Sequence, residues 1–212
     1  MDYLYKRYRC SKDTLKDTLN KYGVAIIPNV LNENECQDMV SGQWDFFEHI
    51  TQDWQVPIDR NNIKTWKEFW KLYPNHSMLI QHWGVGHSQV SWDLRQNPKI
   101  VDIFAHYWDT EPEDLLVSFD GFSFHLPHEI TKRGYFRGNT WYHADQSFKR
   151  NELECIQSWV TGNDVENSDA TLTFYEGSHK LHKKFAETFP DSQTPSDWYK
   201  LTREQEQFYI DH

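Results

Sequence analysis

The stretch NTWYHAD, residues 139–145, decides how the second half of this chain is interpreted. Asn139–His143 is predicted to form a strand. The strand period of two then places the side chains of His143 and Asp145 on one face. An imidazole nitrogen beside a carboxylate oxygen is two-thirds of the facial triad that binds iron(II). On its own the H-x-D spacing is a weak signal, because short motifs arise by chance and such a pair often forms only a surface hydrogen bond.

Further strands are predicted around this motif. Leu115–Phe124, Leu153–Thr161 and Ala170–Tyr175 are rich in aromatic and β-branched residues, and turns with Gly, Asn and Asp separate them. Residues 1–110 instead predict mainly helix. Helices followed by successive strands indicate an α+β chain, with a sandwich or barrel in residues 111–212. The length of 212 residues favours a single domain over the whole chain.

The helical half contains clear start and stop signals. Ser11 is predicted to cap a first helix that Gly23 ends. Asn32 with Glu35 resembles a capping pair at the start of a second, amphipathic helix. A short buried strand is predicted over residues 24–28, and further helices over residues 64–72, 98–107 and 196–210.

Composition excludes several classes of partner. The 32 acidic residues outweigh the 22 basic ones, so most of the surface would repel a nucleic-acid backbone. No apolar stretch is long enough to cross a membrane, and the first residues lack the apolar core of a signal peptide. The three cysteines are far apart and odd in number, which favours a reduced, intracellular (cytoplasmic) location.

Three motifs together resemble the phytanoyl-CoA dioxygenase-like family of iron(II)- and 2-oxoglutarate-dependent oxygenases. The H-x-D pair is followed by Gln157-Ser158-Trp159 and then by Gly177-Ser178-His179-Lys180, in the order that this family shows. Glu176 stands where the family usually has proline. The opening Tyr22–Leu31 is also similar, so the resemblance extends from about Tyr22 to Leu181.

The resemblance implies a double-stranded β-helix, a jelly-roll barrel, which the N-terminal helices buttress. It further implies that His143 and Asp145 bind iron(II), and that Trp159, His125 and Gln157 line the 2-oxoglutarate pocket. No catalytic residue is expected beyond the metal ligands. The implied activity is hydroxylation of a small molecule or side chain with dioxygen, which releases succinate and carbon dioxide.

The family's third ligand, a distal histidine, has no counterpart between Leu181 and His212, and neither does its arginine or lysine for the co-substrate. His179, His182 and His212 do not fit the distal position. We therefore expect C-terminal strands beyond His212, and we expect the 212 residues alone neither to turn over 2-oxoglutarate nor to bind iron(II) tightly. The alternative is a non-catalytic, oxygenase-like binding module that lacks the third ligand.

Two other readings of the charged and histidine residues are weaker. His125 with His128, and His179 with His182, have spacings seen in zinc sites, but the nearest cysteine, Cys155, stands alone and structural zinc sites favour paired cysteines. Four basic residues surround the motif and would attract an acidic ligand, although solvated loop charges are the favoured interpretation; they are Arg133, Arg137, Lys149 and Arg150. The sequence does not determine the substrate or the oligomeric state.

Overall fold

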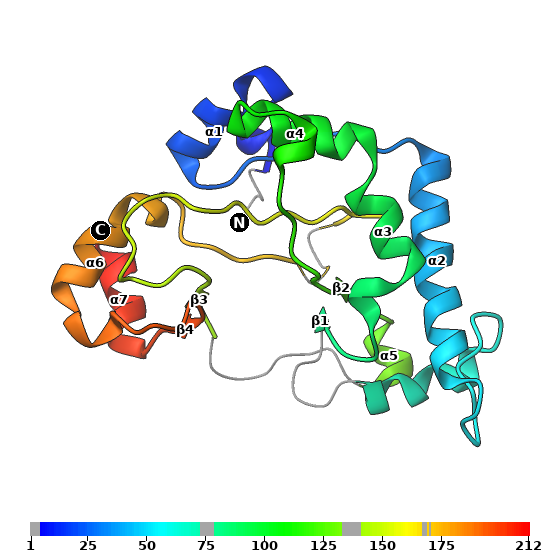
Figure 1. Ribbon diagram of the computed structural model, residues 1–212. Helices are drawn as coiled ribbons and strands as arrows, with labels where there is room; N and C mark the ends of the chain where they lie inside the picture. Colours follow the sequence, from blue (N-terminus) through cyan, green and yellow to red (C-terminus); the bar gives the residue numbers. More distant parts are fainter. Residues whose placement is uncertain (1–4, 73–78, 133–140, 167–168, 170) are drawn as a thin grey trace. The chain divides into compact units, whose positions relative to one another are not determined.

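The computed structural model describes residues 5–72, 79–132, 141–166, 169 and 171–212 (Figure 1). The chain divides into two compact units. Unit 1 comprises residues 1–28, 138–160 and 171–212, and unit 2 comprises residues 29–137 and 161–170. Each unit is described by itself below, and the single domain expected from the sequence stays a prediction. No helix of the described residues has the length and apolar character needed to cross a membrane.

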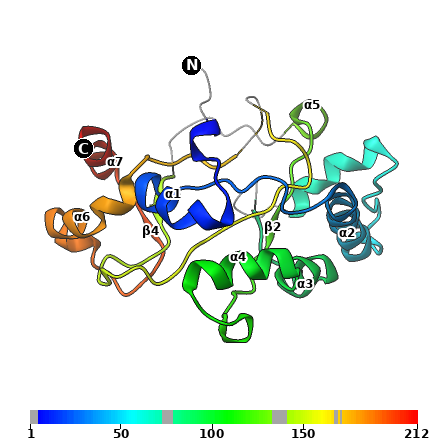
Figure 2. The same cartoon turned by 90° about the horizontal axis from the view of Figure 1, so that it is seen from above.

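Unit 2 is built around the long helix α2 (Glu33–Thr51). The predicted capping pair is confirmed, because the Asn32 side chain accepts from the Glu35 backbone and the Glu35 side chain accepts from the Asn32 backbone. Helix α3 (Gln89–Arg95) lies beside α2, and α4 (Pro98–Trp108) follows it (Figures 1 and 2). The helix predicted over residues 64–72 is a 3₁₀ helix (Ile63–Leu72), and a short helix α5 (His128–Thr131) packs against it.

An aromatic core holds unit 2 together. Phe47 of α2 contacts Phe69 with ring centroids 4.5 Å apart, and Phe69 stacks on Phe124 at 5.3 Å. The edge of this core is a short antiparallel pair, β1 (Leu79–Ile80) with β2 (Phe122–Ser123). The remaining members of the buried cluster are Ile58, Leu72, Ile80 and Val85.

In unit 1, two 3₁₀ helices (Tyr5–Tyr8 and Lys12–Thr14) precede helix α1 (Leu15–Tyr22). Helix α1 ends as predicted at Gly23, whose φ of 78° lies in the left-handed region. The family-like turn 177–180 satisfies the last carbonyls of this helix. Gly177 N donates to Tyr22 O at 3.0 Å, Lys180 Nζ donates to Lys21 O at 3.0 Å, and His179 Nε2 donates to Asn20 O at 3.1 Å. The turn therefore caps a helix end that would otherwise leave its carbonyls without partners.

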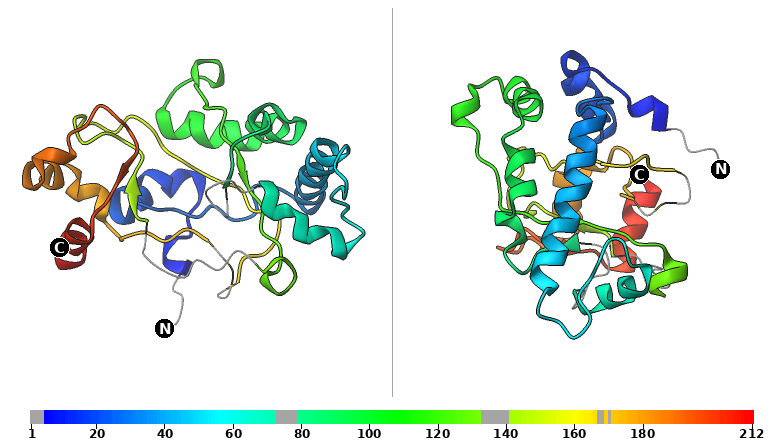
Figure 3. Two further views of the ribbon diagram at one scale, coloured as in Figure 1. Left: turned by 90° about the horizontal axis from the view of Figure 1, so that it is seen from below. Right: turned by 90° about the vertical axis from the view of Figure 1, so that its right-hand side faces the viewer.

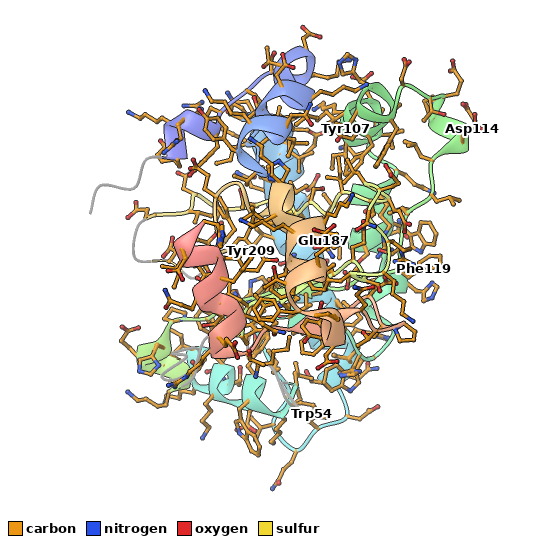
Figure 4. All side chains as sticks on the ribbon, turned by 90° about the vertical axis from the view of Figure 1, so that its left-hand side faces the viewer. Trp54, Tyr107, Asp114, Phe119, Glu187 and Tyr209 are labelled. Atoms are coloured by element: carbon orange, nitrogen blue, oxygen red, sulfur yellow. The ribbon has the colours of Figure 1, made fainter. Side chains whose placement is uncertain are left out.

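The second half of unit 1 packs two helices against a two-stranded ribbon. Helix α6 (His182–Thr188) lies beside α7 (Arg203–Asp211), and Tyr209 of α7 stacks on Phe185 of α6 at 5.2 Å (Figures 3 and 4). Strand β3 (His143–Ala144) pairs antiparallel with β4 (Tyr199–Lys200). The buried cluster consists of Phe148, Phe185, Ala186, Leu201 and Phe208.

The prediction of one helix over residues 196–210 is wrong for its first part. Tyr199 and Lys200 pair with β3, and the helix starts only at Arg203, after a capping box formed by Thr202 and Gln205. Pairing with a distant strand overrides local helix propensity here, because it directs Leu201 into the buried cluster.

The strands predicted from the sequence form only in part. Ladder pairing covers Phe122–Ser123 and His143–Ala144, while Ile26 makes a single parallel bridge with Arg9. Residues 153–161 and 171–175 carry no strand among the described residues, and residues 139–140 and 170 lie outside them. The described chain is thus rich in helix with short antiparallel pairs, and the double-stranded β-helix stays a prediction.

Candidate metal centre

The β3–β4 ribbon has one face toward the core of unit 1 and one face away from it. His143 pairs with Lys200 and Ala144 with Tyr199, and Leu201 N donates to Tyr142 O at 2.9 Å. The core side carries Leu201 together with the partly buried side chains of Tyr142, Ala144 and Tyr199. Because side chains alternate along a strand, the neighbours of these residues project from the opposite face. We call this the site face; it consists of Trp141, His143, Asp145, Trp198 and Lys200.

The two predicted metal ligands meet on the site face. His143 Nε2 lies 3.4 Å from Asp145 Oδ2. The other ring nitrogen, Nδ1, lies 3.0 Å from the carbonyl oxygen of Trp141. A carbonyl oxygen only accepts, so this hydrogen bond assigns the ring proton of neutral His143 to Nδ1. The lone pair of Nε2 then faces a carboxylate oxygen, and the two are compatible only when a proton or another cation lies between them.

The electrostatics of the pair favour positive charge. The hydrogen bond to Asp145 is the main cause that raises the pKa of His143; burial opposes it, and the Trp141 carbonyl adds to it. The same hydrogen bond is the main cause that lowers the pKa of Asp145, and the Gln157 side chain lowers this pKa further. Asp145 is thus held as a carboxylate, the form that binds metal.

The geometry fits two ligands of one metal ion. Two protein atoms that each lie about 2.1 Å from the same ion can be at most roughly 4.2 Å apart. The 3.4 Å between Nε2 and Oδ2 meets this limit. No group of three or more His, Cys, Asp or Glu side chains in the described residues could complete such a site. Among the described residues, unit 1 therefore offers two atoms, His143 Nε2 and Asp145 Oδ2, that could bind one metal ion.

The loop after Asp145 is anchored firmly. Ser147 N donates to Asp197 Oδ1 at 3.1 Å, and Arg150 forms an ion pair with the same carboxylate. Phe148 is 2% exposed in the buried cluster, where it stacks on Phe185. These contacts fix the chain immediately after Asp145, which restricts how far its carboxylate moves from His143.

The remaining predicted site residues lie in different surroundings. Gln157 is brought to Asp145, as described above. Trp159 belongs to unit 1 and is 56% exposed, and its role beside a co-substrate stays a prediction. His125 belongs to unit 2 and is exposed at the surface. Neighbouring protein atoms still remove part of the water around its imidazole, and this desolvation lowers the pKa of His125.

Three other histidines that the sequence places near the expected third ligand are held by backbone carbonyls. His179 bonds to Asn20 O, and His182 Nε2 lies 2.9 Å from Arg150 O. His212 Nδ1 lies 2.8 Å from Phe208 O in the last turn of α7. None of the three joins His143 and Asp145 among the described residues, and the position of the distal ligand stays a prediction.

Sequence reasoning missed three members of the site face. Trp141 stacks on the His143 ring, Trp198 lies beside it in a tilted arrangement, and Lys200 is the cross-strand partner of His143. The helix assigned to residues 196–210 concealed the alternation of Trp198, Lys200 and Thr202 against Tyr199 and Leu201. Reading these residues with a period of two would have placed Trp198 and Lys200 on one face.

The sequence is 25% identical over 197 residues to the Ava biosynthesis cluster protein O of Aspergillus versicolor. The alignment covers 93% of this chain but 59% of that protein, so the chain spans less than two-thirds of the relative's length. No protein-family model matches the sequence, and no solved structure matches it.

Proposed function

We propose that this chain is part of an iron(II)- and 2-oxoglutarate-dependent oxygenase that hydroxylates a small molecule in a biosynthetic pathway. The observation that carries the proposal is the approach of His143 Nε2 to Asp145 Oδ2, 3.4 Å apart on a strand face directed away from the core. The name of the similar Aspergillus protein supports a role in biosynthesis.

Each residue of the site has a defined task in this proposal. The Trp141 carbonyl keeps the ring proton on Nδ1 of His143, which leaves the Nε2 lone pair free to bind metal. The hydrogen bond with His143 is the main cause that lowers the pKa of Asp145, and the Gln157 side chain lowers it further. Bound iron(II) supplies the activation of dioxygen at this position. The third ligand and the cation for 2-oxoglutarate come from chain outside the described residues.

The test is iron-dependent formation of succinate by the full-length polypeptide. We expect the wild type to convert 2-oxoglutarate to succinate in a reaction that requires both Fe(II) and dioxygen. His143→Ala and Asp145→Ala should abolish this reaction. His106→Ala, which removes an exposed histidine of α4 in unit 2, should leave it unchanged. Succinate formation that survives His143→Ala would overturn the proposal.

One observation favours the alternative of a non-catalytic binding module, namely that no third ligand joins His143 and Asp145 in the described residues. The same assay separates the two. If the full-length protein is folded by circular dichroism but forms no succinate, the binding module is the correct alternative and the oxygenase is excluded.

A further inference from the structure

Two exposed indoles flank the imidazole of the candidate metal centre. The Trp141 ring stacks on His143 with centroids 4.7 Å apart and an angle of 17° between the planes. The Trp198 ring lies 5.5 Å from His143 at 33°. The two residues are 36% and 48% exposed, respectively. Tryptophan stabilises a fold most when its large apolar area is buried, so the exposed half of Trp198 leaves aromatic surface for a ligand beside the Trp141–His143 stack.

A lysine shares this face with the indoles. Lys200 is the direct cross-strand partner of His143 and is exposed. The two nearby carboxylates have other partners: Asp145 interacts with His143 and Gln157, while Asp197 binds Arg150 and Ser147. No hydrogen bond or ion pair joins the Lys200 side chain to the part of the chain that the structure describes. Its ammonium group therefore adds an unneutralised positive charge beside the aromatic surface.

From this arrangement we infer that Trp141, Trp198 and Lys200 bind a small planar aromatic carboxylate and thereby present it to the metal centre. The indole faces would stack on the ring, and Lys200 would pair with the carboxylate. The inference names the substrate class of the proposed oxygenase and rests on that function for the step that follows binding.

The charges on the site face distinguish this ligand from the other ligands that indoles bind. An organic cation would gain a cation–π contact with the tryptophans but would face the charge of Lys200. A non-aromatic carboxylate would gain only the ion pair, which is worth little at an exposed site. A planar aromatic anion is the ligand that uses both features.

The test compares three small probes by ligand-observed NMR on the full-length protein without added metal. Indole-3-acetate has the ring and the carboxylate, cyclohexylacetate lacks the aromatic ring, and tryptamine replaces the carboxylate with an amine. Indole-3-acetate should bind roughly three- to tenfold more tightly than cyclohexylacetate, which is the range expected for an aromatic stack. Tryptamine should bind more weakly than indole-3-acetate.

Variants assign the effect to residues. Trp198→Leu should remove the preference for the aromatic ring, and Trp198→Phe should restore most of it. Lys200→Gln should weaken the binding of indole-3-acetate by about two- to fivefold, as expected for the loss of an exposed ion pair. The affinity for neutral indole should not change. The matched controls are Trp70→Leu, which alters an exposed tryptophan of unit 2, and Lys183→Gln, which alters an exposed lysine of α6. Neither control should change the binding of any probe.

Equal affinity for the three probes, tighter binding of tryptamine, or wild-type binding by Trp198→Leu would overturn the inference. Because the probes are measured without metal, this outcome is independent of the succinate assay. Probe binding without succinate formation would exclude the oxygenase function but support the aromatic-carboxylate site. Succinate formation without a preference for the aromatic carboxylate would support the oxygenase and exclude the aromatic-carboxylate site.

Discussion

His143 Nε2 lies 3.4 Å from Asp145 Oδ2, while the opposite ring nitrogen of His143 is held by the carbonyl oxygen of Trp141. The second contact determines what the first can do. With the proton on Nδ1, the lone pair of Nε2 is directed at the Asp145 carboxylate, an arrangement that suits a proton or a metal cation between the two atoms. In our proposal, the pair therefore supplies two ligands to one metal ion at the end of a short strand.

The Gln157 side chain supports this pair without contributing a ligand in our proposal. Gln157→Ala should weaken divalent metal binding by roughly 10-fold or more, since loss of a group that supports a metal ligand typically has this effect. Titration with Mn(II), followed by the loss of the free-ion EPR signal, measures the change. Gln55→Ala, at an exposed position of unit 2, is the control and should bind as the wild type does. Unchanged affinity in Gln157→Ala would exclude this supporting role.

The pH dependence of stability should include a contribution from Glu35 at the start of α2. Its hydrogen bond from Lys99 is the main cause that lowers its pKa from 4.5 to about 2, followed by those from the Asn32 backbone and the Asn97 side chain. A depressed folded-state pKa stabilises the fold above the unfolded value of 4.5, and this stabilisation is lost as the pH falls toward 2.

Urea unfolding at several pH values between 7 and 2.5 tests this expectation. Glu35→Gln should be less stable than the wild type at pH 7, and the difference should shrink as the pH falls below about 4.5. Glu33→Gln, which changes an exposed acid in the same helical turn, should show no such convergence. A constant difference between wild type and Glu35→Gln across this range would contradict the assignment.

Gly23 should be sensitive to the smallest side chain. Its φ of 78° is left-handed, and a Cβ at this position would lie 2.5 Å from His179 Nδ1. Gly84 also has a left-handed φ, of 71°, but a Cβ there would meet nothing within 4 Å. Both Ala substitutions carry the backbone cost of about 1–2 kcal/mol, and Gly23→Ala should cost more because His179 must move away from Asn20 O. Equal thermal stability of the two variants would show that the turn 177–180 can move away from the new Cβ without a loss of stability.

Phe185 should be a principal stabilising residue of unit 1. It is 0% exposed and contacts Phe148, Phe189, Phe208 and Tyr209. Phe185→Ala should lower the free energy of unfolding by about 3–5 kcal/mol, the usual cost of a large cavity in a core. Lys183→Ala on the same helix should change it by less than about 0.5 kcal/mol. Chemical denaturation measures the free energy of unfolding of both variants. A small decrease for Phe185→Ala would mean that the surrounding side chains move in to fill the cavity.

Local signals explain which elements the sequence predicted well. Gly23 ends α1, and Asn32 with Glu35 starts α2, because caps act between residues that are close in the chain. The pairing of Lys200 with His143 could not be predicted in the same way. It joins distant residues, and its register depends on burying Tyr142 and Leu201 against a core that only exists in the folded unit.

The candidate site shows the same division. The spacing of His143 and Asp145 predicted a shared strand face, and the two side chains do meet. The ring contacts of Trp141 and Trp198 with His143, and the backbone partners of His179 and His182, depend on tertiary structure. The iron, the co-substrate and the β-helix stay predictions.

We propose that His143 and Asp145 bind one divalent metal ion together, and a Mn(II) titration of the full-length protein is the decisive test. The wild type should bind one Mn(II), and His143→Ala and Asp145→Ala should each weaken this binding at least about 10-fold, while His106→Ala binds as the wild type does. A wild type that binds no Mn(II), or a His143→Ala variant that binds it equally well, would show that His143 and Asp145 do not form a metal site.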